Sequence, residues 1–259
     1  MGVVNVTPDS FSDGGRFLDS GAAIDHARRL IGEGADIVDV GGESTRPGAQ
    51  PVVAAEELHR VLPVVRALRD ASVPVAVDTL KPEVMRAAIA EGASIVNDVY
   101  ALRMPGALDA LCASDAGICL MHMQGEPRTM QAAPHYGDVV GEVKSFLQQR
   151  MAAAASAGIS GARVAIDPGF GFGKTVEHNL ELLRRLPELV ELGVPVLVGL
   201  SRKSTLGAIT GRPATGRLAA SIAAALLAVQ RGATIVRVHD VAATRDALAV
   251  LAAVETFQQ

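Results

Sequence analysis

Polar side chains stand where short apolar segments end, and their types suit recognition of a flat heterocycle. Asp78, Asn97 and Asp167 each close such a segment. Carboxylates and amides accept hydrogen bonds, and a guanidine-like ring edge offers paired N–H groups that one carboxylate accepts together. Lys203 and Arg237 would donate to ring carbonyl oxygens. The residues therefore predict a pocket for a donor-rich heterocycle.

A second group of side chains indicates an anion site beside that pocket. Arg237 and His239 are two residues apart, so a strand would place both on one face. Asn5 and Arg46 add donors, and we expect Asn5, Arg46, Arg237 and His239 to bind a phosphate-bearing group. Mg²⁺ held by Asn5 and phosphate oxygens would need few other protein ligands.

Helix capping is the simpler explanation for any single aspartate or asparagine at a strand end. Asp36 and Asp98 are candidates for capping or turn roles. Capping does not explain why cations accompany the whole set, so we favour a binding site.

Other chemical motifs fail on inspection. Residues 169–175 end like a phosphate-binding loop, but its leading glycine would fall on Pro168. Ser201 lacks the second glycine of a nucleophile elbow. The histidines show no metal-ligand spacing.

The elements that position these residues recur as a helix, a glycine and a short apolar strand. Residues 33–40, 91–98 and 231–238 share this pattern, and glycine just past a helix is a common cap. The pattern predicts helices at 54–70, 82–91 and 139–157, and a buried helix at 218–230. Strands are predicted at 2–6, 36–40, 74–78, 94–98, 117–121, 163–167, 195–199 and 234–238.

This alternation predicts an α/β fold, a single-domain (β/α)₈ barrel over residues 1–259. Each strand–helix unit has about 32 residues, which is typical of such barrels. All strand carboxyl ends then meet at one face, where the site would lie. A doubly wound open sheet is the alternative, but residues 5–9 are not the glycine-rich turn it would usually show after its first strand.

Composition limits the class of protein. Hydrophobic residues make up 49% and charged residues 20%, which excludes disorder as the main state. The net charge of −4 argues against nucleic acid as the main partner. No segment is long and apolar enough to predict a membrane span or a secretory leader. The two cysteines, Cys112 and Cys119, suggest no oxidising compartment, so we expect a cytoplasmic protein.

The motifs, taken together, resemble those of the dihydropteroate synthases, a pterin-binding barrel family of folate biosynthesis. They run in family order over nearly the whole chain. The matching segments are residues 1–15, 39–48, 77–79, 97–99, 121–125, 167–174, 201–204 and 237–240.

The resemblance implies a reaction and a set of roles. The family condenses 6-hydroxymethyl-7,8-dihydropterin pyrophosphate with p-aminobenzoate, assisted by Mg²⁺, and its members are typically homodimers. Segments 7–15 and 43–48 would be mobile loops closing over the site. By motif, the pterin would contact Asp78, Asn97, Met121, Asp167, Lys203 and Arg237. The pyrophosphate would contact Asn5, Arg46, Arg237 and His239, with Asn5 also at the metal. The p-aminobenzoate site would be formed by Phe11, Thr45, Arg46, Pro47, Phe172, Lys203 and Ser204. The catalytic residues would be Asp78, Asp167, Lys203, Arg237 and His239.

Two other functions fit part of this pattern. A folate-dependent methyltransferase domain would share the pterin-binding aspartates and asparagine, but it would not need the phosphate-binding set. A non-catalytic pterin-binding subunit would use the same fold without the reaction.

Overall fold

Parallel strands alternate with helices along the chain. The structure is a computed structural model that describes residues 1–7, 20–44, 48–126 and 129–256. Its strands are β1 (Gly2–Asn5), β2 (Val38–Gly41), β3 (Val75–Asp78), β4 (Ile95–Asp98), β5 (Gly117–Met121), β6 (Val164–Asp167), β7 (Leu197–Val198) and β8 (Ile235–Val236).

The helices lie between these strands. They are α1 (Ser20–Gly32), α2 (Ala54–Ala67), α3 (Pro82–Ala90), α4 (Ala107–Cys112), α5 (Val139–Ser156), α6 (Val176–Arg184), α7 (Pro187–Val190), α8 (Ser204–Thr210), α9 (Leu218–Gln230) and α10 (Val241–Thr256). The short 3₁₀ helices η2 (Gly161–Arg163) and η3 (Ala214–Gly216) precede β6 and α9.

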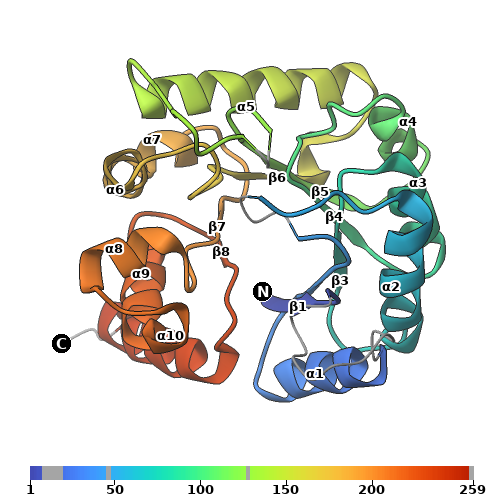
Figure 1. Ribbon diagram of the computed structural model, residues 1–259, viewed down its shortest axis with the longest axis horizontal. Helices are drawn as coiled ribbons and strands as arrows, with labels where there is room; N and C mark the ends of the chain where they lie inside the picture. The colour runs from blue at the N-terminus through green and yellow to red at the C-terminus, as the bar shows by residue number, and fades with distance from the viewer. Residues whose placement is uncertain (8–19, 45–47, 127–128, 257–259) are drawn as a thin grey trace.

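The strands close into a ring. β1 to β6 pair in chain order as one parallel sheet, and β7 pairs with β8. Isolated parallel bridges, Ile166 with Val196 and Gly2 with Val238, join the two sheets on both sides. The helices surround this ring in Figure 1, with α1 at the bottom, α2 to α4 along the right, α5 across the top and α6 to α10 along the left. The predicted (β/α)₈ barrel is therefore confirmed.

The barrel interior is a separate apolar layer. Its cluster takes one residue from each strand or from the position just before it: Met1, Ile37, Ala76, Ile95, Cys119, Ala165, Leu197 and Ile235. Valines on the opposite strand faces, such as Val38 and Val77, pack in the larger core outside the ring. Because side chains alternate along a strand, the residue two positions after each interior residue also faces inward. These residues include the polar side chains of Asp39, Asp78, Asn97, Asp167 and Arg237.

The helix at 218–230 differs from its expected burial. Its bounds are those predicted, but only one face is buried, through Ser221, Ala224, Ala225 and Ala228. Leu218 and Leu227 are exposed. The small residues allow close packing on one side, while the expectation of an enclosed helix is wrong.

Within the described ranges, no helix combines the length and the apolar character that crossing a membrane requires.

Candidate functional site

A buried network of charged and amide side chains lies at the carboxyl ends of the strands. Arg237 Nε donates to Asp39 Oδ2 at 2.6 Å, and Nη2 donates to Asp78 Oδ2 at 2.9 Å. Asn97 Nδ2 donates to the same Asp39 oxygen at 3.1 Å. Asp78 and Asn97 are directly paired in register between β3 and β4. Four residues from distant parts of the chain therefore form one connected group.

Two acceptor atoms of this network have no donor. Asp39 Oδ1 and Asn97 Oδ1 are buried and unpaired among the described residues. Buried polar atoms normally have hydrogen-bond partners, because a buried donor or acceptor left without one costs about 1–3 kcal/mol. These oxygens are therefore suited to a ligand that presents N–H groups.

Asp39 is a functional candidate that the residue assignments missed. It lies in β2, its side chain is 0% exposed, and it holds both Arg237 and Asn97. The available signal was its place two residues after Ile37, on the inward face of a predicted strand. Its contacts with Arg237 and Asn97 depend on closure of the barrel, which the sequence alone does not show.

Burial brings the titrating groups of the site toward neutrality. It raises the pKa of Asp78 to about 7, although Arg237 opposes the shift. It also raises the pKa of Asp167, opposed by the ammonium of Lys203. Burial lowers the pKa of Lys203 to about 8, and the carboxylate of Asp167 opposes that change. Both carboxyls and this lysine are thus electrostatically coupled at one site.

Lys203 connects this network to an aromatic side chain. Its Nζ donates to the backbone carbonyl of Phe170 and lies 4.7 Å from the centroid of the Phe172 ring. Gly199 has both Lys203 Nζ and Arg237 Cβ within 3.8 Å of where a Cβ would stand, so the two side chains approach each other there. Met121 packs in a small cluster against Phe172. The polar network thus forms the base of the site, and Met121 and Phe172 form an apolar wall beside it.

The remaining predicted residues lie around this centre. Asp167 ends β6, and its Oδ1 accepts from Gly169 N at 2.7 Å. His239 follows β8, with Nδ1 3.0 Å from the hydroxyl of Ser201. Ser204 is exposed at the start of α8, next to Lys203. Arg237 lies with the carboxylates at the base of the mouth, so its assignment to the phosphate rim stays a prediction.

Asn5 is the residue predicted to meet the metal. It ends β1 half-buried and pairs with Gly41, which in turn pairs with Asp78. Its amide oxygen is a suitable ligand for Mg²⁺, which prefers oxygen and keeps several waters. The described residues contain no group of three or more His, Cys, Asp or Glu side chains that could hold a metal. The donor set therefore fits a cation carried largely by phosphate oxygens.

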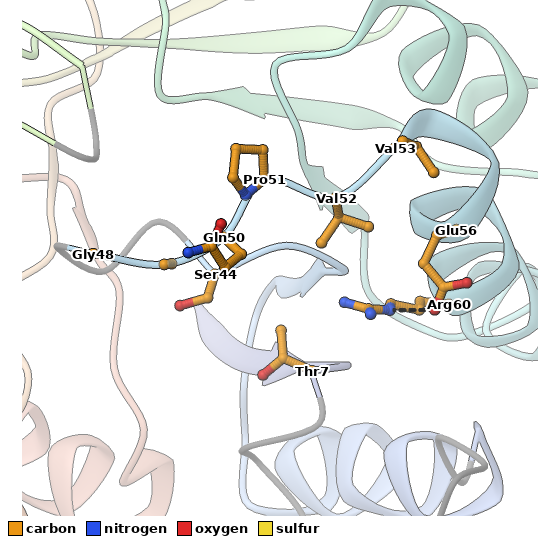
Figure 2. Close-up of a pocket in the computed structure, with 10 residues that line it drawn as sticks. Thr7, Ser44, Gly48, Gln50, Pro51, Val52, Val53, Glu56 and Arg60 are labelled. Atoms are coloured by element: carbon orange, nitrogen blue, oxygen red, sulfur yellow. Dashed lines mark hydrogen bonds and ion pairs between the residues drawn. The ribbon is translucent and has the colours of Figure 1, made fainter.

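A cavity of about 650 Å³ opens beside this mouth, between the segments that follow β1 and β2. Figure 2 shows Thr7 and Ser44 on one side, and Glu56 and Arg60 of α2 on the other. Arg60 is fixed there by Glu56 at 3.0 Å and by the carbonyl of Gly42 at 2.8 Å. The predicted residues Phe11, Thr45, Arg46 and Pro47 lie outside the described residues. So do most of the two segments predicted to be mobile loops.

The fold and the site define a class: an α/β barrel enzyme with a polar ligand site at the carboxyl ends of its strands. The model of a family described as "pterin binding enzyme" matches residues 1–239.

Curated and structural relatives are similar over nearly the whole chain. The dihydropteroate synthase of Haemophilus influenzae is 51% identical, covering 96% of this chain and 91% of the relative. The Xanthomonas albilineans dihydropteroate synthase with 4-aminobenzoic acid superposes with a TM-score of 0.94 at 57% identity, covering 99% and 93%. A structure of the synthase from that organism in complex with 7,8-dihydropteroate gives a TM-score of 0.90 at 53% identity, also covering 99% and 93%. The chain belongs to the pterin binding enzyme family, and within it to the dihydropteroate synthases.

Proposed function

We propose that this chain condenses 6-hydroxymethyl-7,8-dihydropterin pyrophosphate with p-aminobenzoate to give 7,8-dihydropteroate and pyrophosphate. The amine nitrogen of p-aminobenzoate forms a bond to the methylene carbon of the pterin. The bond from that carbon to the pyrophosphate oxygen breaks, and the nitrogen loses a proton. The observation that carries the proposal is the network of Asp39, Asp78, Asn97 and Arg237, with its unpaired acceptors, in a chain of this family.

The polar base of the barrel would bind the pterin. Asp78, Asn97 and Asp167 offer acceptors for the N–H groups of its guanidine-like edge, and Lys203 offers a donor to its carbonyl. Met121 would line the pocket. Positive charge left on the methylene as pyrophosphate departs would be stabilised through the ring by the carboxylates of Asp78 and Asp167.

The phosphates would lie further out. Arg237 and His239 would donate to the departing oxygens, together with Asn5 and Arg46. When bound, Mg²⁺ supplies charge neutralisation of the pyrophosphate, with Asn5 as its proposed protein ligand. No strong base is needed, because an aryl amine is already a nucleophile.

The p-aminobenzoate would bind against the apolar wall. Phe172, Lys203 and Ser204 are the proposed contacts from the described residues, and Phe11, Thr45, Arg46 and Pro47 are proposed from the two loops. Closure of these loops would exclude water, which would otherwise capture the methylene.

We also propose that residues 1–259 form one domain that acts in the cytoplasm as a homodimer. The ring of strands, which draws on residues from Gly2 to Val236, supports one domain. The absence of a spanning helix among the described residues is compatible with a cytoplasmic site of action. Exposed apolar side chains on α9 and α10 support an interface between two copies.

The direct test is release of pyrophosphate by purified protein supplied with Mg²⁺ and the pterin pyrophosphate. We expect release that depends on p-aminobenzoate, with dihydropteroate formed in equal amount. Bound pterin without any release would contradict the proposal and favour a non-catalytic pterin-binding subunit. Methyl transfer from a methylated folate to a corrinoid would favour the methyltransferase.

A further inference from the structure

Lys174 carries a buried ammonium for which the proposed reaction has no use. Lys174 is 3% exposed. It directly follows residues 169–173, which form a loop after β6. Nζ lies 2.9 Å from His122 Nδ1, and it donates to the Gly169 carbonyl at 2.9 Å and to the Phe172 carbonyl at 3.0 Å. An ammonium has three hydrogens, so these contacts use its full donor capacity.

The loop that Lys174 binds is held by side chains from other elements. Every backbone carbonyl from Gly169 to Gly173 accepts a side-chain hydrogen bond. The donors are Lys174 for Gly169 and Phe172, Lys203 for Phe170, Gln131 for Gly171 and Tyr136 for Gly173. No strand or helix fixes these peptides, so the loop is held by these side-chain donors together with one backbone bond, from Phe172 N to the Gly169 carbonyl at 3.1 Å.

Two glycines allow this loop to lie close to the backbone that follows β5. Gly169 has φ +68°, and a Cβ there would stand 1.8 Å from the carbonyl oxygen of His122. Gly173 has φ +62°, and its Cβ would stand 2.6 Å from the carbonyl oxygen of Gln124. Only glycine permits this approach. Lys174 therefore bridges the loop and His122 where the two backbones approach each other this closely.

The two phenylalanines of the loop are anchored differently. The Phe170 side chain is 0% exposed and packs in the core, so its own burial holds it. Phe172 is half-buried and lies beside Met121 and Lys203 at the mouth of the barrel. Its backbone carbonyl is held by Lys174. The position of the Phe172 ring thus depends on the lysine more than that of Phe170 does.

We propose that Lys174 is a positioning residue, whose bond to the Phe172 carbonyl fixes the Phe172 ring as a wall of the p-aminobenzoate site. This inference rests on the proposed function. It assigns Lys174 a role in recognition of the second substrate, without contact to either substrate.

The test is Lys174→Met, which keeps the length of the side chain and removes every donor. We expect the KM for p-aminobenzoate to rise at least tenfold, while the KM for pterin pyrophosphate changes less than threefold. Equal rises in both KM values, or no rise in either, would overturn the proposal. Tyr136→Phe is the matched control, because it removes another buried donor to the same loop, at Gly173, and should leave both KM values within twofold.

A double-mutant cycle separates positioning from general stability. If Lys174 acts through the Phe172 ring, Lys174→Met should change the KM for p-aminobenzoate less than threefold when Phe172→Ala is already present. Full additivity of the two effects would show that the lysine acts elsewhere and would overturn the proposal.

One measurement needs neither activity nor a variant. In the wild-type protein, ¹⁵N NMR of histidine rings should show His122 with an unprotonated Nδ1 that accepts a hydrogen bond. A protonated Nδ1 would mean that Lys174 does not donate to His122, and it would overturn the proposal even if Lys174→Met does not fold. A wild-type protein that releases no pyrophosphate would instead contradict the proposed function, with the NMR result still standing on its own.

Discussion

At the residue scale, the pocket contains buried acceptors that are left unpaired within the described residues. Asn97 donates its Nδ2 to Asp39, and this bond sets the amide so that Oδ1 is directed away from the network. One carboxylate oxygen of Asp39 accepts hydrogen bonds from Arg237 and Asn97, and the other oxygen is unpaired. The cost of these unpaired oxygens would be recovered when a donor-rich ring binds.

Replacing Asp39 should destabilise the protein, because Arg237 would then lose one of its two buried carboxylates. For Asp39→Asn we expect the free energy of unfolding to fall by about 3 kcal/mol, as for other broken buried ion pairs. Urea denaturation measures this change. Asp36→Asn is the control, since Asp36 is exposed and pairs with Arg245 at 3.3 Å on the surface. Comparable losses in both variants would contradict the role given to Asp39.

The pKa values of the site predict a bell-shaped pH dependence of kcat/KM for pterin pyrophosphate. As pH rises through about 7, Asp78 loses its proton and becomes a better acceptor, so the rate should rise. Above about 8, Lys203 loses its charge and becomes a weaker donor, so the rate should fall. Lys203→Arg should move the descending limb to higher pH, because arginine stays protonated. A descending limb unmoved by this variant would show that another group controls it.

At the element scale, strand ends could be predicted while contacts between strands could not. The apolar runs and the glycines that precede them indicated the strands, and alternation along the strands put Asp78 and Asn97 on the inward face. The bond between Asp39 and Arg237 joins residues 198 positions apart and depends on closure between β8 and β1. The contact of Lys174 with His122 depends likewise on how a loop folds back onto β5. Neither leaves a periodic signal in the sequence.

The turn after β4 shows how a predicted cap became part of a strained loop. Asp98 accepts from Tyr100 N at 2.7 Å and from Leu102 N at 2.6 Å. Ala101 and Leu102 adopt φ values of +53° and +56°, which side chains rarely adopt. Asp98 is therefore the residue that holds this turn, as the turn role considered for it would require.

Asp98 should also make stability depend on pH in a definite direction. Burial raises its pKa from 3.8 to about 6. Between these values the unfolded chain ionises first, so this group lowers wild-type stability as pH rises. For Asp98→Asn, which cannot ionise, the deficit relative to wild type should shrink by about 2 kcal/mol between pH 4.5 and pH 7.5. Urea denaturation at both pH values tests this, and a deficit that grows with pH would refute it.

At the scale of the whole molecule, the helices α9 and α10 carry exposed apolar side chains. Val250 and Val254 of α10 are 66% and 70% exposed, and they are four residues apart on one helix face. Leu218 and Leu227 are exposed on α9, which packs against α10. A stable interface needs an apolar centre of this kind, so we expect it to be where two copies meet.

Sedimentation equilibrium of the wild-type chain should therefore show a dimer, and a charge on α10 should weaken it. For the double variant Val250→Glu with Val254→Glu we expect the dissociation constant to rise at least tenfold, because each carboxylate would have to be buried unpaired. Val53→Glu is the matched control: Val53 is 71% exposed and directly precedes α2. Helix α2 lies on the opposite side of the molecule from α9 and α10 in Figure 1, so the dimer should persist. A monomeric wild type would contradict the dimer itself. An intact dimer in the double variant, with Val53→Glu dissociated, would instead place the interface on the side of α2.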